Sequence, residues 1–445
     1  MEDIIEPVVA VIGAGPAGLF AARDLATNGV QVVIFNRDIK PGGLAEYGIY
    51  PEKHKMKDGL RKQFRQILAL PNIHYFGNVL IGLNGDFSID DLVGMGFDAL
   101  LVTVGAQATK WLGIPGENLK GVYHAKEIVY HYNRLPPFSQ INIQIGRKVA
   151  LVGAGNVMLD LARWLITEKM VSEVLTIIRR GPAEVKFDKA QLEYVAENVN
   201  WKALKNEFER VTPIMKTVGE NSEETYEFFR SACNKVVSNP STSKMSFHFL
   251  ASPIQIIGDD KGCVKGLEVE ENSLTFQNET VVPVGTNIRK VFDVDTIIFA
   301  IGDRVDSRIG LPTSGNEFLK NPNPRFPIED QSFEVFDPAE NKPLKGLFMA
   351  GWARKASTGL VGTARKDGTQ GAAAVLQYLR EKAAKNHNSV DLIIEKLTTL
   401  KQPVIIKQDI IKLEEIENER AVQLGLPEFK YASNSEMLKA IGRGE

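Results

Sequence analysis

The sequence predicts an α/β fold made of two Rossmann-like dinucleotide-binding domains, the second inserted into a discontinuous first domain. One observation is a repeated unit: an apolar run, a glycine-rich turn and an amphipathic segment occur at Val8–Thr27 and again at Lys148–Lys169. The other is a third glycine-rich stretch, Gly351–Thr363, far downstream of both units. A loop at that position completes the first domain only by folding back past the second, which predicts the insertion.

Bulk composition is that of an ordinary globular protein. The 445 residues allow two or three domains, and a net charge of −2 favours neither nucleic acid nor an anionic membrane as partner. The acidic start, Met1–Pro7, and the lack of an apolar run of about 18 residues predict a cytoplasmic protein. Cys233 and Cys263 are too few for a disulfide scaffold or a four-cysteine iron–sulfur cluster. The oligomeric state stays open.

The first unit is predicted as a strand at Val8–Ile12, a turn at Gly13–Gly18 (GAGPAG), a helix over Ala17–Thr27 and a strand over Val30–Phe35. GxGxxG in this βαβ context predicts a dinucleotide site, where the glycines allow a tight turn, close approach of a pyrophosphate and helix packing. Asn36 stands where an acidic residue normally holds the ribose. An amide can still bond a ribose hydroxyl, so the choice between FAD and NAD here is open.

More turns and strands follow before the first domain ends. Lys40–Ile49 is rich in turn residues, and the sequence then predicts a helix to Leu68 and a strand at Phe76–Leu80. A strand over Phe97–Val104 ends at Gly105, a second place where backbone can approach a cofactor. We expect the chain to leave the first domain at residue 112.

The second unit repeats the pattern with two changes. Its strand, turn, helix and strand are expected at Lys148–Val152, Gly153–Met158, Leu159–Lys169 and Val174–Ile178. Met158 replaces the third glycine, which weakens the match but keeps the two glycines that admit a phosphate. Arg179 and Arg180 follow the second strand, where an acid would favour NAD and guanidinium groups favour the 2′-phosphate of NADP. A pair of solvated surface arginines is the alternative.

The rest of the chain predicts a helix-rich stretch at 183–246, strands at Val264–Glu271 and Phe292–Ala300, and a tail of two or three short helices. We therefore expect 1–112 and 333–385 to form the first domain, 113–332 the inserted domain and 386–445 a helical tail.

The stretch Gly351–Thr363 follows an apolar strand, Gly346–Ala350, and leads into a helix to about Lys385. Backbone N–H groups at such a helix start are unpaired and the helix dipole adds to them, so the loop suits an anionic or electron-rich group. Four cations in or just after it predict either a docking patch for an acidic partner or ordinary solvated charges: Arg354, Lys355, Arg365 and Lys366.

Several stretches together resemble NADPH–ferredoxin reductases of the adrenodoxin-reductase type: VVAVIGAGPAGLFAA, PGGLAEYGIYPEKHKMK, VALVGAGNVMLDLAR, IIRRGPAE and GWARKASTGLVGTARKDG. The likeness covers nearly the whole chain. It implies FAD on the first unit, NADP on the second, hydride transfer between them, and single electrons passed to a ferredoxin- or flavodoxin-type carrier. The sequence is more distantly similar to the glutamate synthase small subunit.

The resemblance also implies the site residues. The FAD contacts would be Gly13, Gly15, Pro16, Ala17, Gly18, Asn36, Gly43, Leu44, Val79, Gly105, Gly351, Trp352, Gly359, Leu360 and Val361. NADP would be held by Gly155, Asn156, Val157, Met158, Arg179, Arg180 and Gln191. Catalysis would involve His54, Trp352 and Gly359.

Three departures from the family pattern affect these roles. The family's histidine is shifted by one residue, so Lys53 competes with His54 for the role of proton carrier. Gln191 stands where relatives have an acid near the NADP ribose, and Asn36 is the third departure. Weaker ribose contacts at both sites leave NADH as an alternative to NADPH.

The expected enzyme is an FAD-dependent NADPH–ferredoxin oxidoreductase, with two other functions left open. The chain could be the electron-input subunit of a larger enzyme, although it lacks that relative's N-terminal cysteine clusters. It could also be a flavin-binding regulatory protein without turnover, to which Asn36 and Met158 point. A thiol–disulfide reductase is disfavoured because neither cysteine lies near a cofactor motif.

Overall fold

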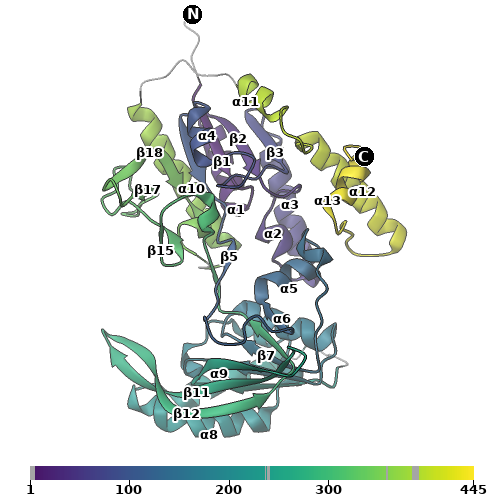
Figure 1. Ribbon diagram of the computed structural model, residues 1–445, viewed down its shortest axis with the longest axis vertical. Coiled ribbons are helices and arrows are strands. Elements are labelled where there is room, and N and C mark those ends of the chain that lie inside the picture. The colour runs from purple at the N-terminus through teal and green to yellow at the C-terminus, as the bar shows by residue number, and fades with distance from the viewer. Residues whose placement is uncertain (1–5, 236, 238–240, 357–358, 383–389, 445) are drawn as a thin grey trace, which may run out of the picture. The chain divides into compact units, whose positions relative to one another are not determined.

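The computed structural model describes residues 6–235, 237, 241–356, 359–382 and 390–444, and Figure 1 labels many of its elements. The chain forms two compact units. Unit 1 contains Met1–Thr109, Tyr130–Gln140 and Asp303–Glu445, and unit 2 contains Lys110–Val129 and Ile141–Gly302. Unit 2 is therefore inserted into unit 1, which agrees with the predicted fold class. The predicted helix end at Lys385 and the start of the tail at 386 lie outside the described residues.

The unit boundaries differ from the predicted ones, because residues 303–332 return to unit 1 directly after the last strand of unit 2. β14 (Asp303–Arg304) pairs antiparallel with β5 (Ala108–Thr109), and Val305 and Phe318 lie in the core of unit 1. Neither feature has a local sequence signal, since both are long-range contacts. The short strands β15 (Thr313–Ser314) and β16 (Glu317–Phe318) complete this stretch.

Unit 1 is built on six strands: β1 (Val8–Ile12), β2 (Gln31–Asn36), β3 (Ile73–Gly77), β4 (Ala99–Val102), β17 (Glu334–Asp337) and β18 (Lys342–Met349). Their order is β17-β18-β4-β1-β2-β3, and every pair is parallel except β17 with β18. Ile12 lies opposite both Phe35 and Val102, and Val102 lies opposite Met349. Four strands therefore end side by side at one sheet edge, where α/β folds bind ligands.

Both faces of this sheet are covered. Because side chains alternate along a strand, Val9 and Val11 of β1 face one core and Ala10 and Ile12 face the other. The first core is closed by α1 (Pro16–Ala26), α3 (His54–Leu68) and α10 (Val361–Glu381), and the second by α4 (Ile89–Gly94) and α11 (Val390–Leu397).

The C-terminal tail packs on unit 1 as well. Ile410 and Leu413 of α12 (Lys407–Leu424) and Met437 of α13 (Asn434–Ile441) lie in the same core as α1. Backbone hydrogen bonds between Gly77 and Ile405 tie the tail to the end of β3. Among the described helices of the whole chain, none is both long and apolar enough to cross a bilayer.

Unit 2 has a parallel sheet in the order β6-β13-β7-β8-β9. These strands are β6 (Val122–His124), β13 (Thr296–Phe299), β7 (Lys148–Val152), β8 (Glu173–Ile177) and β9 (Lys244–His248). Ile177 lies opposite both Val152 and His248, so three strands again end together at one edge. The second glycine-rich turn and the two arginines follow strands at this edge.

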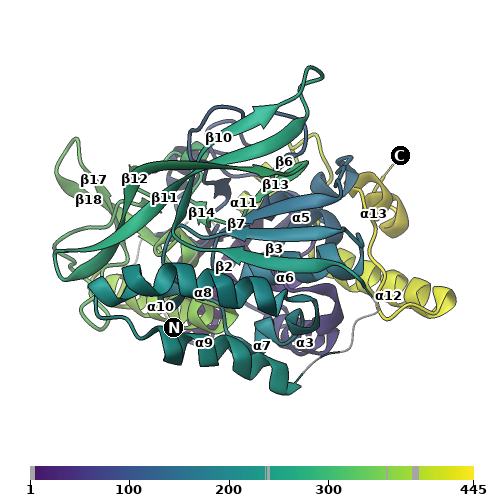
Figure 2. The same ribbon diagram turned by 90° about the horizontal axis from the view of Figure 1, so that it is seen from below.

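A three-stranded antiparallel sheet completes unit 2, made of β10 (Ala251–Gly258), β11 (Val264–Gln277) and β12 (Thr280–Asp293). β11 is longer than the predicted strand, and Phe292 belongs to β12 rather than to the predicted strand that continues to Ala300. The helices of unit 2 include α6 (Asn156–Thr167), α7 (Lys189–Leu192), α8 (Trp201–Thr217) and α9 (Ser222–Ser231), and α5 (Ala125–Tyr132) begins in this unit. Figure 2 shows α8 and α9 side by side, and α8 contacts β9 and β11.

Candidate functional site

The first glycine turn, Gly13–Gly18, leads from β1 into α1. Gly13 has φ +107°, and a Cβ there would lie 2.8 Å from the Thr103 carbonyl oxygen, so only glycine fits. A Cβ on Gly18 would overlap the Gly13 carbonyl oxygen. At Gly15, by contrast, the space is open, and among the described residues no side chain caps α1. Uncapped N–H groups beside open space at a helix N-terminus fit a pyrophosphate.

Asn36, at the end of β2, is buried and bonded within the protein. Its Oδ1 accepts a hydrogen bond from the Ala14 N–H at 3.1 Å. Its Nδ2 donates to the carbonyl oxygens of Asp38 and Lys40 at 2.8 and 3.1 Å, and lies 3.2 Å from the Tyr75 hydroxyl. These contacts fasten the glycine turn to the following loop. The predicted ribose contact of Asn36 stays a prediction, since both of its amide hydrogens face protein acceptors.

The loop Lys40–Tyr47, which ends in α2 (Leu44–Tyr47), closes over the first glycine turn. The Gly42 N–H donates to the Ala14 carbonyl oxygen at 2.7 Å. A Cβ on Gly43 would lie 3.1 Å from the Gly15 Cα, so the two backbones are in close contact. The structure thus brings together two predicted cofactor residues, Gly15 and Gly43, from separate segments.

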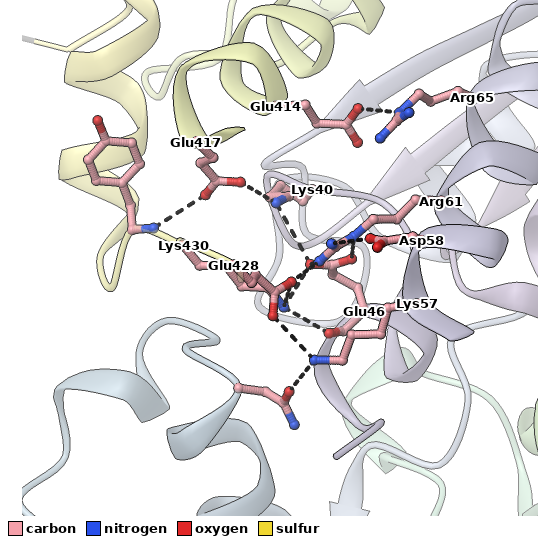
Figure 3. A network of polar contacts seen from close by, with 12 residues as sticks. Lys40, Glu46, Lys57, Asp58, Arg61, Arg65, Glu414, Glu417, Glu428 and Lys430 are labelled. Atoms are coloured by element: carbon pink, nitrogen blue, oxygen red, sulfur yellow. Dashed lines mark hydrogen bonds and ion pairs between the residues drawn. The ribbon is translucent and has the colours of Figure 1, made fainter. Parts of the chain in front are cut away.

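A buried network of charges, the tail clamp, holds this loop against the C-terminal tail (Figure 3). The Glu46 carboxylate, 3% exposed as a residue, lies 2.7 Å from Lys430 Nζ and 2.6 Å from Arg61 Nη2. Lys40 forms an ion pair with Glu417 of α12, and Arg61 forms one with Glu428. No local sequence pattern indicates the pairs with the tail, because their partners lie hundreds of residues away along the chain.

The electrostatics of the tail clamp follow from burial and pairing. Burial alone would raise the pKa of Glu46, but Lys430, Lys40 and Arg61 hold that pKa well below its ordinary value. Burial would lower the pKa of Lys40, but Glu417 and Glu46 outweigh it and raise that pKa. Lys57 is different: burial and the nearby Lys430 lower its pKa to about 8.

The segment after β18 is fastened to α10. The Gly351 N–H donates to Asp367 Oδ2 at 2.6 Å, and the same carboxylate forms a buried ion pair with Arg354. Gly351 has φ +70°, and a Cβ there would lie 2.6 Å from the Ala17 Cβ. Further into α10, a Cβ on Gly368 would overlap the Ala17 carbonyl oxygen. Glycines therefore let this segment and α10 approach the start of α1.

These contacts correct the predicted docking patch. Arg354 is 2% exposed, bonded to Asp367 and Gln331, and stacked over the Phe333 ring at 4.3 Å, so it is not a surface cation. Lys355 is half-buried. Arg365 and Lys366 are exposed, with Arg365 over the Phe20 ring at 4.3 Å and Lys366 paired with Glu329 at 3.2 Å. Arg354 and Asp367 are positioning residues that the sequence pattern did not distinguish from surface charges.

The second glycine turn, Gly153–Met158, leads from β7 into α6. α6 begins at Asn156 rather than at the predicted Leu159, because Gly155 is extended and the helix starts directly after it. Space at Gly155 is open, and no described side chain caps the helix. This start therefore fits a second phosphate group. Met158 is fully buried, so the core accommodates the side chain that replaces the third glycine.

Two other predicted residues of the second site, Asn156 and Gln191, already form hydrogen bonds within the protein. The Asn156 amide exchanges two hydrogen bonds with Asp188, at 2.7 and 2.8 Å, so only its backbone is available. Val157 is 48% exposed at the start of α6. Gln191 lies in α7 and donates its backbone N–H to the Asp188 carbonyl oxygen at 2.9 Å.

The chain matches a model of a known protein family. The model described as pyridine nucleotide-disulphide oxidoreductase matches residues 7–325. The chain belongs to this family.

The sequence of this oxidoreductase aligns with those of two relatives over almost their full length. NADPH-ferredoxin reductase FprA of Mycobacterium leprae is 27% identical, with 98% of each chain covered. NADPH:adrenodoxin oxidoreductase of Salvelinus fontinalis is 25% identical, with 97% of this chain and 91% of the relative covered. The structure of Mycobacterium tuberculosis FprA in complex with NADPH superposes with a TM-score of 0.81 at 24% identity, over 98% of this chain and 99% of that chain.

Membership confirms the predicted fold class, the oxidoreductase activity, and FAD with a pyridine nucleotide as cofactors. The two uncapped turns of this pyridine nucleotide-disulphide oxidoreductase fit the phosphates of two dinucleotides. Its two cysteines, Cys233 and Cys263, are free thiols of unit 2 outside both turns.

Most of the remaining predicted residues of the oxidoreductase lie near the starts of helices or just after strands. Leu360 is the N-cap of α10 and Val361 is its first residue, and among the described residues no side chain caps this helix. Trp352 is half-buried beside Gly351, Gly359 is exposed, Val79 is buried, and Leu44 is half-buried. Gly105 follows β4, and Pro16 opens α1. His54 is the first residue of α3 and Lys53 its N-cap, so both lie at one helix start, and the proton-carrier role of either residue stays a prediction.

Proposed function

We propose that this protein is an NADPH–ferredoxin reductase. The observation that supports it best is the presence in one chain of two uncapped glycine turns, in a chain that aligns from end to end with NADPH-ferredoxin and NADPH:adrenodoxin reductases. FAD would occupy the first turn and NADPH the second. FAD, when bound, accepts a hydride from the nicotinamide and gives up electrons singly.

The chain's own residues bind and orient the flavin in this proposal. The N–H groups at the start of α1 hold the pyrophosphate, and the loop at Gly43 covers it. The start of α10, after Leu360, where no described side chain caps the helix, supplies N–H groups and a helix dipole for negative charge that develops on the ring. The Asp367–Gly351 hydrogen bond fixes the backbone before that helix start. Correct positioning of the two rings supplies much of the rate in such a transfer.

The electron acceptor in this proposal is a ferredoxin- or adrenodoxin-type iron–sulfur protein. Ferredoxins of this type are acidic, and the exposed cations near the start of α10 are Arg365 and Lys366, with the half-buried Lys355 in the preceding segment. We propose these three residues, without Arg354, as the docking cations.

Anaerobic titration tests the whole proposal. Purified yellow protein should lose its flavin absorbance on addition of NADPH, and added ferredoxin should be reduced in turn, more slowly at high salt. Flavodoxin serves as the second acceptor. The proposal fails if neither NADPH nor NADH bleaches the flavin, or if the bleached protein reduces neither carrier.

A further inference from the structure

The turn after β8 holds one of the two arginines in an ion pair. Arg180 Nη1 lies 2.6 Å from Glu184 Oε1, and the Gly181 N–H donates to Glu184 Oε2 at 3.4 Å. The Glu184 side chain is only 15% exposed, whereas that of Arg180 is 41% exposed. The Glu184 carboxylate is therefore fixed at this turn, and it neutralises part of the charge that Arg180 would offer to a phosphate.

A second acid adds to the negative charge of the same turn. Glu220 Oε2 is buried, and among the described residues it has no hydrogen-bond partner. It lies 3.2 Å from the position that a Cβ on Gly181 would take. Burial and the Glu184 carboxylate raise the pKa of Glu220, in accord with two acids close together.

Arg179 differs from Arg180. It is exposed, and the part of the chain that the structure describes gives its side chain no hydrogen bond or ion pair. Its backbone is fixed, because Asn272 Nδ2 donates to the Arg179 carbonyl oxygen at 2.9 Å. The Arg179 guanidinium is thus available to a ligand, while that of Arg180 must first leave Glu184.

We propose that Glu184 determines nucleotide specificity in this protein by holding Arg180, so that the second site discriminates weakly between NADPH and NADH. This inference rests on the proposed function, in which the second site takes a nicotinamide dinucleotide. A 2′-phosphate must compete with the Glu184 carboxylate for Arg180 and must approach a turn that carries a further acid. A ribose without this phosphate meets neither penalty.

Binding of 2′,5′-ADP and 5′-AMP, measured by calorimetry on the intact flavoprotein, tests this inference, because the two ligands differ only in the 2′-phosphate. Glu184→Gln keeps an acceptor for the Gly181 N–H but removes the charge that holds Arg180. We expect this variant to bind 2′,5′-ADP about 3- to 10-fold more tightly, a modest gain because Arg180 is partly solvated, and to bind 5′-AMP with unchanged affinity. Glu173→Gln removes the same charge from the other end of β8 and should change neither ligand.

Arg179→Ala should then abolish most of the preference for 2′,5′-ADP that the unaltered protein shows. Equal changes for both ligands in Glu184→Gln, or no change for either, would overturn the inference. These measurements need no flavin reduction, so they separate the inference from the proposed function. If nicotinamides fail to bleach the flavin but Glu184→Gln selectively tightens 2′,5′-ADP, the proposed function is wrong and the specificity role of Glu184 holds.

Discussion

The Gly351 N–H donates a 2.6 Å hydrogen bond to the carboxylate of Asp367, sixteen residues along the chain. The same carboxylate pairs with the buried Arg354. One side chain of α10, that of Asp367, therefore fixes both the backbone turn after β18 and the guanidinium group of Arg354. This contact joins the segment after β18 to α10, and both pack against Ala17 of α1, the segment through Gly351 and the helix through Gly368.

Replacing Asp367 by asparagine should weaken the contact between α10 and the segment after β18. The amide of Asp367→Asn would still accept from Gly351 but would leave the Arg354 charge unpaired in the interior, which destabilises a protein by about 3–5 kcal/mol. We expect a lower melting temperature and flavin release below the unfolding transition, followed by flavin fluorescence. Glu329→Gln, which breaks the exposed pair with Lys366, is the control and should change stability by less than about 0.5 kcal/mol. Equal effects of the two variants would contradict this role.

Gly368→Ala should separate α10 from α1. The added methyl group would overlap the Ala17 carbonyl oxygen, and overpacking of this kind costs about 1–3 kcal/mol. Gly59→Ala is the matched control, since Gly59 is a helical glycine of α3 with no atom near its Cβ position. That change should stabilise the protein by about 0.5–1 kcal/mol through helix propensity. Urea titration measures the free energy of unfolding of both variants, and an unchanged value in Gly368→Ala would refute the close packing.

Introducing an acid at position 36 should weaken flavin binding at the first site. Asn36→Asp would place a carboxylate against the carbonyl oxygens of Asp38 and Lys40, where the amide now donates two hydrogen bonds. Leaving those buried acceptors unpaired costs about 1–3 kcal/mol. We expect lower flavin content and stability, measured by absorbance and thermal unfolding. A gain in FAD affinity would instead show that the residue acts mainly on the ribose.

Glu417→Gln should open the tail clamp. It removes the charge paired with buried Lys40, so we expect a loss of about 2–4 kcal/mol and faster FAD dissociation, because the Lys40–Tyr47 loop closes over Gly15. Glu414→Gln, on the same helix and paired with the half-exposed Arg65, should have little effect. If both variants retain FAD as the unaltered protein does, the tail has no part in holding the loop.

Lys57 should make stability depend on pH in alkaline solution. Its pKa is lowered from 10.5 to about 8, so the unfolded chain holds this proton more tightly than the folded protein. Unfolding free energy should therefore rise between pH 8 and 10.5, by about 2–3 kcal/mol from this group. Lys57→Met should lack that rise and gain relative stability at pH 7, whereas Lys55→Met on the exposed side of α3 should keep it. Denaturant titrations at about pH 7 and about pH 10.5 decide between these outcomes.

How much the sequence could predict depended on the range of the interactions. Gly13, Gly15 and Gly155 were recognisable because a turn between strand and helix is a local requirement on backbone shape. The pairing of Arg354 with Asp367, or of Glu46 with Lys430, is set by tertiary packing, and a charged residue looks the same in sequence whether it is buried or solvated. The partners of Asn36 escaped prediction for the same reason, because they come from a neighbouring strand and a loop.

The tail clamp has a consequence for how the protein is made. Lys40 and Glu417 are 377 residues apart. At roughly 5–20 residues per second, tens of seconds pass on the ribosome between the synthesis of the lysine and that of its counter-charge. During that interval the nascent chain has its first glycine turn but not the carboxylates that keep the covering loop in place. Secure retention of FAD should therefore follow completion of the tail, and a chain stalled before α12 should be poorly loaded with flavin.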